Sequence, residues 1–397
     1  MIGAIGYGAS VVALVVAAAG ALLALRERTR GGVALAARAA DLAFVALLAA
    51  NLLMVAALIG RDFSVAYVTQ VGSRATPLLY TVASLWGALE GSILFWAVLL
   101  AGATSLLVRR TSALDRHLLP VALAVLLGLL AFFVFLIVGP GNPWARIDPP
   151  PPDGPGPNPL LQNHPLMAFH PPLLYVAFVG LAVPYAITIA ALIERRLDGR
   201  WLFAARRWTL GSWIFLTLGL LAGSWWSYSV LGWGGYWAWD PVENVALLPW
   251  LTSTAFLHSA MVQARRGNLR TWNLALVVAS FLLTILATLV TRSGILNSVH
   301  SFTESQIGPR FLALLAVLLV GTITAAVLRT PERGTGRAGG STRTSAFLLN
   351  NLVLVAIAAT VLTGTLFPLF VEAASGFEAL NPLPHHKFDA ILTAIND

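Results

Sequence analysis

The stretch that decides the fold lies between residues 225 and 250 and reads WWSYSVLGWGGYWAWDPVENVALLPW. Six of the chain's 13 tryptophans fall within it, and it contains no lysine or arginine. Glycines at 232, 234 and 235 remove side chains between the rings, so the backbone there can bend and let a flat ligand approach closely. The pattern predicts a broad aromatic surface with an acid, Asp240, at one edge. The tryptophans expected to form this surface are Trp225, Trp226, Trp233, Trp237 and Trp239.

Two structural interpretations compete with a binding surface. Trp and Tyr also anchor helix ends at a membrane–water boundary, although five tryptophans between 225 and 239 exceed what such a belt needs. The sequence Asp240-Pro241-Val242-Glu243 places Asp at the N-cap, Pro at N1 and Glu at N3, which predicts a capping box at the start of a helix. Capping by Asp240 is compatible with a role in shaping the surface.

The composition identifies a membrane protein. Of the 397 residues 58% are hydrophobic and only 11% are charged, whereas a soluble domain has about 25% charged residues. The chain has no cysteine, which excludes disulfides, thiolate metal ligands and a thiol nucleophile of its own. It also lacks a GxxxxGK[ST] phosphate-binding loop, so it contains no ATPase of that class.

Ten apolar runs are long enough to cross a bilayer core of about 30 Å. They predict an all-α fold, a polytopic membrane bundle of about ten transmembrane helices with short outer surface helices. Gly87 and Glu90-Gly91-Ser92 break the third run, so we expect a short surface helix before a span that starts near 91. The runs lie at 4–25, 34–60, 77–108, 117–139, 170–193, 206–224, 245–264, 271–291, 310–328 and 346–371.

The basic residues predict the orientation. Nineteen of the 25 fall in one set of alternate connections, which the positive-inside rule places in the cytoplasm. Both termini and the aromatic stretch are then outside the cytoplasmic membrane. The first span has its arginines after it, so we do not expect a cleavable signal peptide. Because the basic residues do not gather on one face, the pI near 10.5 does not indicate nucleic acid.

Two histidines are expected beside the aromatic surface. His170 precedes Pro171-Pro172, which predicts a position outside helical geometry at the outer mouth of the fifth span. His300 lies just beyond the outer end of the eighth span. Two imidazoles that flank an aromatic slot suit the axial positions of a six-coordinate haem iron. The alternative is two surface histidines with ordinary hydrogen bonds.

Two further ionisable residues are expected within the membrane. His258 lies about 13 residues inside the seventh span, roughly 20 Å deep, where such a group is costly and usually functional. A neutral histidine bonded across helices is the alternative. Glu90 is also expected to be deep, and a hydrogen bond within the broken helix explains it as well as proton transfer does. The histidines expected to be solvated are His117, His164, His385 and His386.

The propionates of haem require cations. Arg292 is the outer arginine closest in sequence to a candidate ligand, and bidentate pairing makes it the first choice. Arg61, Arg74 and Arg146 are the other candidates.

These motifs resemble those of the CcmF family, the integral-membrane haem lyase subunit of the cytochrome c maturation system. These motifs occur in the family's order, and the tryptophan-rich one is its WWD signature almost letter for letter. The segments that carry the resemblance are DFSV at 62–65, WGALEGS at 86–92, NPLLQ at 158–162 with HPP at 170–172, residues 233–244, His258-Ser259 and residues 292–300.

The resemblance implies that His170 and His300 ligate a substrate haem on the outer face and that the WWD segment binds it. It implies that His258 is one ligand of a resident haem b, which keeps the substrate iron reduced with electrons from quinol. The implied partners are the haem chaperone CcmE, apocytochrome c and its thiol-handling maturation proteins. The vinyl groups of the haem are joined to the two thiols of a CxxCH motif.

The chain departs from the family at its end. Members usually continue past a sequence like Gly364-Thr365-Leu366-Phe367-Pro368-Leu369 into further spans, a second intramembrane histidine and a large outer domain. This chain stops at Asp397, as a fragment, a split subunit or a short variant. The second ligand of haem b is not identified in it, so we expect weak or five-coordinate binding of intramembrane haem by this chain alone.

The expected organisation has three regions: membrane helices at 1–139, a haem-handling core at 140–310 and shorter C-terminal membrane helices at 311–397. The expected function is that of a haem lyase subunit, a holocytochrome c synthase that acts in a complex and contributes mainly by positioning. Two alternatives remain open. One is a haem transporter that hands haem to a separate lyase, and the other is a scaffold whose tryptophans can be replaced.

Overall fold

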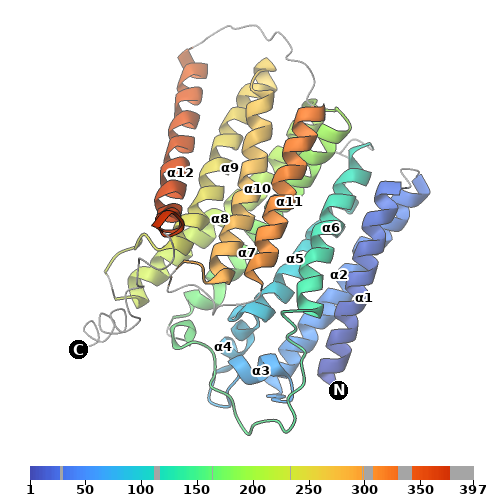
Figure 1. Ribbon diagram of the computed structural model, residues 1–397, viewed down its shortest axis with the longest axis vertical. Helices are drawn as coiled ribbons and strands as arrows, with labels where there is room; N and C mark the ends of the chain where they lie inside the picture. Colours follow the sequence, from blue (N-terminus) through green and yellow to red (C-terminus); the bar gives the residue numbers. More distant parts are fainter. Residues whose placement is uncertain are drawn as a thin grey trace.

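The computed structural model describes residues 1–26, 30–110, 117–162, 164–232, 234–296, 298, 307–329 and 342–375. This part of the chain forms a bundle of long helices that run side by side (Figure 1). The long helices are α1 (Ile2–Arg26), α2 (Arg30–Ile59), α5 (Leu89–Arg109), α6 (Leu118–Val138), α7 (Leu166–Ile193), α8 (Gly199–Val230), α9 (Pro241–Arg266), α10 (Arg270–Ser293), α11 (Gly308–Arg329) and α12 (Thr342–Ser375).

Among the described residues, nine of these helices are long and apolar enough to cross a membrane. The remaining long helix, α8, contains tryptophans and arginines that lower its mean hydropathy. It has 32 residues, so it is about 48 Å long, and it packs against α7 within the bundle. The predicted polytopic, all-α membrane bundle is confirmed.

The two ends of the bundle differ in character. One end carries the N-terminus and the short helices α3 (Ala66–Val71) and α4 (Leu78–Ala83), at the bottom of Figure 1. We call residues 60–88 and 139–162 at this end the platform; they include the 3-10 helices η1 (Ser84–Trp86) and η3 (Pro159–Gln162). The opposite end, the arginine-rich end, includes the arginines that close α1, α5 and α9 and those that open α8 and α10.

Tyr67 lies at the centre of the platform. Its hydroxyl donates to the Ser84 carbonyl at 2.6 Å and accepts from the Ala88 N–H at 3.2 Å. Burial raises the pKa of this hydroxyl well above its ordinary value, so it remains a neutral donor at physiological pH. The Ala66 N–H also donates to the Ala145 carbonyl at 2.8 Å, which joins the two halves of the platform.

The predicted interruption of the third apolar run is confirmed. α4 and η1 lie on the platform, and α5 starts at Leu89. Gly91 is required there because a Cβ atom would lie 2.2 Å from the Leu85 carbonyl and 2.4 Å from the Tyr67 ring. The first turn of α5 therefore packs directly against the platform at Leu85 and Tyr67.

Polar side chains join α9 to its neighbours inside the membrane layer, where hydrogen bonds between helices are a common device. Trp250 of α9 donates from Nε1 to Thr217 Oγ1 of α8 at 2.9 Å. Trp213 of α8 donates in return to Thr254 at 2.8 Å, and the two indoles stack with centroids 6.1 Å apart. Trp250, the last residue of the aromatic stretch, therefore packs between α8 and α9.

The contact at Gly91 predicts a large stability difference between two glycine substitutions. Gly91→Ala should lower the thermal unfolding temperature of the detergent-solubilised protein, because overpacking of this kind costs about 1–3 kcal/mol. Gly128→Ala in α6 is the matched control, since a Cβ there meets nothing within 4 Å. Equal melting temperatures for the two variants would contradict the contact.

Candidate functional site

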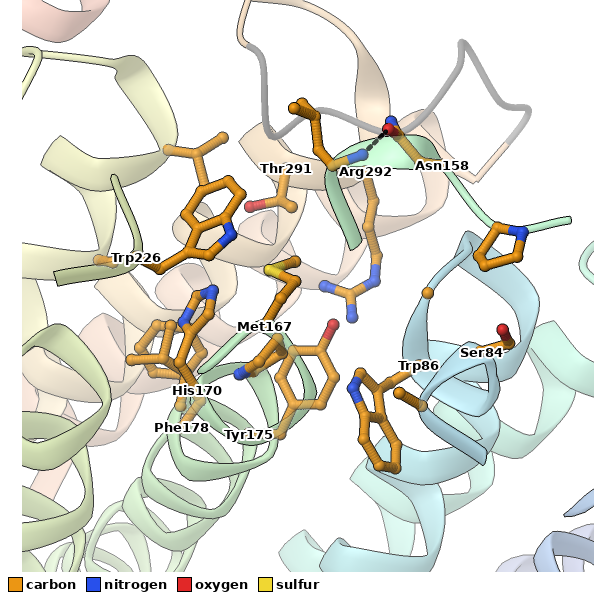
Figure 2. A pocket seen from close by; sticks show the side chains of 18 of the residues that line it. Ser84, Trp86, Asn158, Met167, His170, Tyr175, Phe178, Trp226, Thr291 and Arg292 are labelled. Carbon is orange, nitrogen blue, oxygen red and sulfur yellow. Dashed lines mark hydrogen bonds between the residues drawn. The ribbon is translucent and has the colours of Figure 1, made fainter. Parts of the chain in front are cut away.

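A pocket of about 170 Å³ lies between the platform and the adjoining ends of α7, α8, α9 and α10. It brings together three residues that the sequence predicts from separate segments: His170 of α7, Trp226 of α8 and Arg292 of α10 (Figure 2). The platform closes the pocket with residues from η1 and from the segment just before η3.

His170 and Trp226 face each other across the α7–α8 contact. His170 is 8% exposed, and its ring stacks on the Trp226 indole with centroids 5.9 Å apart and planes inclined by 23°. Gly223 makes this possible, because a Cβ atom there would lie 3.3 Å from His170 Nδ1. An imidazole held in this way has a defined orientation toward the pocket.

The structure corrects the predicted position of His170. α7 begins at Leu166, so His170 lies inside the helix and not in extended backbone at its mouth. The helix tolerates Pro171 and Pro172 because the carbonyls that lose a backbone N–H donor belong to its first turn. His164 is not simply solvated, since its Nδ1 accepts the Leu166 N–H of the first turn of α7 at 3.2 Å.

Arg292 enters the pocket from the last turn of α10 and is only 3% exposed. Its Nη2 donates to Ser92 Oγ at 3.1 Å, and its guanidinium carbon lies 5.7 Å from the centroid of the Tyr175 ring. Such a distance suits a cation–π interaction. A guanidinium buried among helices is costly and marks a functional position.

The other candidate arginines have structural roles on the platform. Arg61 donates to the Thr81 hydroxyl at 2.9 Å. Arg74 donates from Nε to the Pro152 carbonyl at 2.9 Å, and Arg146 pairs with Asp148 at 3.2 Å. None of the three lines the pocket, which leaves Arg292 as the cation of this site among the described lining residues.

Aromatic side chains that were not predicted as site residues line the pocket. Trp86 of η1 and Tyr175 of α7 both contact Phe95, with ring centroids 5.4 Å and 6.1 Å away. On the segment before η3, Asn158 Oδ1 accepts the Leu160 N–H at 3.0 Å and shapes the turn there (Figure 2). Sequence reasoning had no signal for Tyr175, because a spacing of five residues from His170 does not place two side chains on one face of a helix.

The aromatic stretch is not the single surface that the sequence predicted. α8 continues to Val230, beyond the predicted end at 224, so Trp225 and Trp226 are helical neighbours on different faces. Trp225 is 60% exposed, whereas Trp226 is 2% exposed. Trp239 is also exposed and has a left-handed backbone with φ of +62°. Trp233 lies outside the described residues.

The first turn of α9 holds residues 237–240 in place. Asp240 caps the helix by accepting the Val242 N–H at 2.8 Å, which confirms the predicted N-cap. Glu243 accepts the Ala238 N–H at 2.9 Å, two residues before the expected partner. Asn244, a residue the sequence analysis missed, accepts from Trp237 Nε1 at 3.2 Å and donates to the Trp239 carbonyl at 3.1 Å.

Asp240 also joins the aromatic stretch to the connection that follows α10. Ser298 donates from Oγ to Asp240 Oδ1 at 2.8 Å. Ser298 belongs to the same motif as His300, which lies outside the described residues. A position of His300 beside His170 therefore stays a prediction.

His258 is far from this pocket. It lies 17 residues after the first residue of α9, about 26 Å along the helix, and nearer to the arginine-rich end. Its Nδ1 is 2.9 Å from the side-chain amide nitrogen of Asn350 on α12, and the Phe347 ring lies 6.0 Å away. His385 and His386 lie outside the described residues.

Glu90 is not deep in the membrane. It lies in the first turn of α5, where a carboxylate is favoured by the helix dipole. It lies at the end of the span and not deep within it, because α5 starts at residue 89 and the broken part of the run belongs to the platform. Its Oε2 is buried and has no hydrogen-bond partner among the described residues. Both interpretations of Glu90, a hydrogen bond within the broken helix and proton transfer, therefore stay predictions.

Comparison with known proteins gives consistent matches. The family described as "Cytochrome C assembly protein" matches residues 86–296. The cytochrome c-type biogenesis protein CycK of Rhizobium meliloti is 40% identical over 384 residues, which cover 95% of this chain and 56% of CycK. The cytochrome c-type biogenesis protein CcmF of Pseudomonas aeruginosa is 44% identical over 321 residues, 79% of this chain and 48% of that protein.

A solved structure titled "Cytochrome c Heme Lyase CcmF" has the same fold. It superposes with a TM-score of 0.78 at 38% sequence identity, over 94% of this chain and 57% of that structure. The chain spans about half the length of the curated relatives it matches.

The contacts of Asn244 predict how the aromatic stretch is ordered. Asn244→Leu removes both side-chain hydrogen bonds, each worth about 1 kcal/mol net, while Asp240 still caps α9. Amide hydrogen exchange at residues 234–240 should therefore rise roughly tenfold, with that of 246–262 unchanged. Asn244→Asp keeps the acceptor for Trp237 and should give an intermediate rate. No change at 234–240 in the Leu variant would show that Asn244 does not order the stretch.

Proposed function

The chain belongs to the CcmF family of cytochrome c assembly proteins, and from that membership we propose that it takes part in cytochrome c maturation by holding a substrate haem at the platform end of the bundle. In this proposal the acceptor is an apocytochrome c with a CxxCH motif. The haem arrives from the chaperone CcmE, and thiol-handling maturation proteins deliver the reduced acceptor. The haem is the substrate, and this protein acts as one subunit of a larger assembly.

The convergence of His170, Trp226 and Arg292 in one pocket carries the proposal. An imidazole supplies an axial ligand for iron, an indole offers an apolar face for a macrocycle, and a guanidinium suits a propionate. The three residues come from three helices, α7, α8 and α10. Together they offer one partner for each chemical feature of haem: His170 for the metal, Trp226 for the flat apolar ring and Arg292 for the anionic edge.

The size of the pocket indicates how much of the haem it receives. Its volume of about 170 Å³ is below the range of roughly 300–1,000 Å³ for sites that enclose a small molecule. The pocket therefore receives one part of the macrocycle, and we propose that the rest extends over the aromatic stretch, where Tyr236 and Trp239 are exposed. This arrangement keeps the vinyl groups accessible to the thiols of the acceptor.

The reaction requires positioning more than acid–base chemistry. Each thiol adds to a vinyl group: the sulfur bonds to the carbon next to the porphyrin, and the thiol hydrogen goes to the terminal carbon. No atom is lost, and no net oxidation occurs. Holding the haem in a fixed orientation converts the encounter of vinyl and thiol into a nearly intramolecular step. Because the chain has no cysteine, both reacting thiols come from the acceptor.

His258 fits the role of one axial ligand of a resident haem b. Asn350 holds the Nδ1 side of the imidazole, as a partner around a metal site commonly does. The amide nitrogen of Asn350 faces Nδ1 in the structure, so ligation of iron through Nε2 requires the amide group to turn so that its oxygen accepts an Nδ1–H. A haem held there would provide one-electron chemistry, which would keep the substrate iron reduced at the expense of quinol. The described residues contribute one such ligand, and the second is not among them.

We further propose that the protein lies in the cytoplasmic membrane with the platform outside. The arginine-rich end holds most of the basic residues that flank the helices, which the positive-inside rule assigns to the cytoplasm. Thioether formation at the platform then takes place on the outer side, where the acceptor and CcmE are expected.

The assignment of His170 predicts a loss of function without a loss of protein. His170→Ala should reduce cytochrome c maturation to background in cells that depend on this protein, while its level in the membrane is unchanged. His164→Asn is the matched control, because an asparagine side chain can also accept a backbone N–H two residues on, and it should mature cytochrome normally. Haem staining of the cytochromes and immunoblotting of the membrane fraction measure both effects. Normal maturation in the His170 variant would refute the assignment.

The second site can be tested separately by its absorption spectrum. His258→Ala should remove the haem b bands of the purified protein, and Asn350→Leu should weaken haem affinity about 10- to 100-fold, as expected for a partner of a metal ligand. Asn350→Gln retains an amide and should retain most of the haem. Unchanged haem b content in the His258 variant would exclude this residue as a ligand.

A further inference from the structure

A second and larger cavity lies apart from the haem pocket, between α2 and α5 on one side and α7 and α8 on the other. Its volume is about 830 Å³, within the range of sites that bind small molecules. Phe44, Leu99, Val179 and Phe215 are typical of its apolar walls. We call this cavity the α5–α8 groove.

The groove has one charged end. Arg110, directly after α5, and Arg207 of α8 are the charged residues among its described lining residues, and both lie at the arginine-rich end. Along α5 the lining extends from Arg110 to Phe95, about 22 Å at helical rise. One leaflet of a bilayer core is about 15 Å thick, so the groove is long enough for the tail of a lipid in that leaflet.

Small residues keep the groove open. Gly102 of α5, Gly180 of α7 and Gly211 of α8 all line it. A Cβ atom at Gly211 would meet nothing within 4 Å, so the space beside this residue is available to a ligand. α7 packs against both α5 and α8 and contributes Val176, Val179 and Gly180 to the lining.

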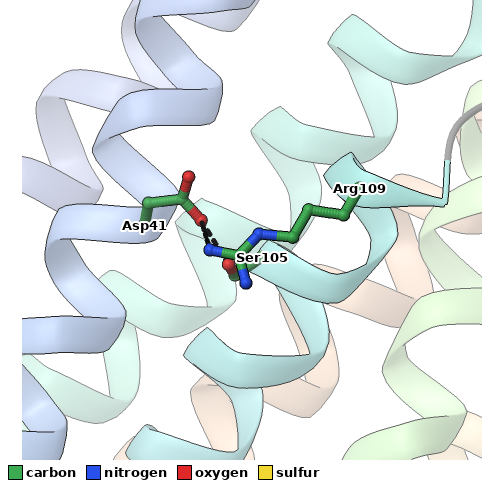
Figure 3. A network of polar contacts seen from close by, with 3 residues as sticks. All are labelled: Asp41, Ser105 and Arg109. Atoms are coloured by element: carbon green, nitrogen blue, oxygen red, sulfur yellow. Dashed lines mark hydrogen bonds and ion pairs between the residues drawn. The ribbon is translucent and has the colours of Figure 1, made fainter.

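An acid of α2 at this end of the bundle already has partners. Asp41 pairs with Arg109 at 3.1 Å and accepts a hydrogen bond from Ser105 (Figure 3). None of these three residues lines the groove. Arg110 and Arg207 do line it, and the Arg207 guanidinium carbon lies 5.5 Å from the centroid of the exposed Phe203 ring. An anionic amphiphile complements these two charges and the apolar walls.

We propose that the α5–α8 groove binds an anionic phospholipid of the leaflet at the arginine-rich end. The phosphate lies between Arg110 and Arg207, since guanidinium groups bind phosphate through paired hydrogen bonds. One acyl chain follows α5 toward Phe95. Basic pockets between transmembrane helices are suited to anionic lipid head groups, and here the pocket continues into a channel for the tail.

Haem and free phosphate fit the groove less well. Haem is also an anionic amphiphile, but its iron requires a ligand such as His, Met, Cys or Tyr, and the described lining contains none of these. Free phosphate makes no use of the apolar walls. A neutral quinol makes no use of two arginines.

The test is lipid retention by the purified full chain, measured by native mass spectrometry after delipidation in detergent and addition of phosphatidylglycerol or phosphatidylcholine. The wild-type protein should retain phosphatidylglycerol in preference to phosphatidylcholine. R110Q/R207Q should lower this retention about 30-fold, since each arginine near the membrane surface contributes about fivefold to binding an anionic lipid. R200Q/R206Q is the matched control: it removes the same charge from the same end but lies outside the groove, and it should behave like the wild type.

A second variant tests the tail. Gly211→Leu places a side chain in the open part of the groove without a change of charge, and it should lower phosphatidylglycerol retention while melting in lipid-free detergent stays like the wild type. Three results would overturn the proposal: equal retention of both lipids, equal effects of the two arginine double variants, or a copurifying haem that R110Q/R207Q removes. Unchanged retention in Gly211→Leu would overturn the placement of the tail.

Discussion

A hydrocarbon core offers no hydrogen-bonding partner to a peptide group, so every backbone N–H and C=O within it must be satisfied inside the chain. In this protein the constraint produces long helices and moves irregular backbone to their ends. The broken run before α5 illustrates this: α4 and η1 lie on the platform, and the uninterrupted helix starts only at Leu89. The described glycines with a left-handed backbone, such as Gly156, Gly232 and Gly234, lie outside the helices for the same reason. A site that needs bent backbone can form at such an end and not in the middle.

The contacts that finish the helices also build the site. His164 accepts the N–H of the first residue of α7, the helix that carries His170. Asp240 caps α9 and accepts a hydrogen bond from Ser298, so one carboxylate orders both the aromatic stretch and the connection after α10. Arg292, at the end of α10, reaches Ser92 near the start of α5. Side chains at the ends of α5, α7, α9 and α10 thus make these contacts. Each of these side chains either lines the pocket or contacts a segment that carries a pocket residue.

Some of this could be predicted from the sequence because it depends on local chemistry. Apolar run length predicted the bundle, and the order Asp240-Pro241 predicted the start of α9. Other features depend on packing that no local pattern contains. α8 continues beyond 224 because its last turns contact α7, and this contact separates Trp225 from Trp226. The double hydrogen bond of Asn244 required the aromatic stretch to fold back over α9, which cannot be read from spacing alone.

α7 connects the two cavities of the structure. Its residues His170, Leu174 and Phe178 line the pocket at the platform, whereas Val176, Val179 and Gly180 line the α5–α8 groove. Phe95 of α5 also lies between the two cavities, because it lines the groove and contacts Trp86 and Tyr175 of the pocket. Passage of a ligand from the groove to the pocket would therefore require Phe95 to turn aside or α7 to move away from α5 or α8, against which it packs closely. Occupation of either cavity from its own end of the bundle requires no such motion.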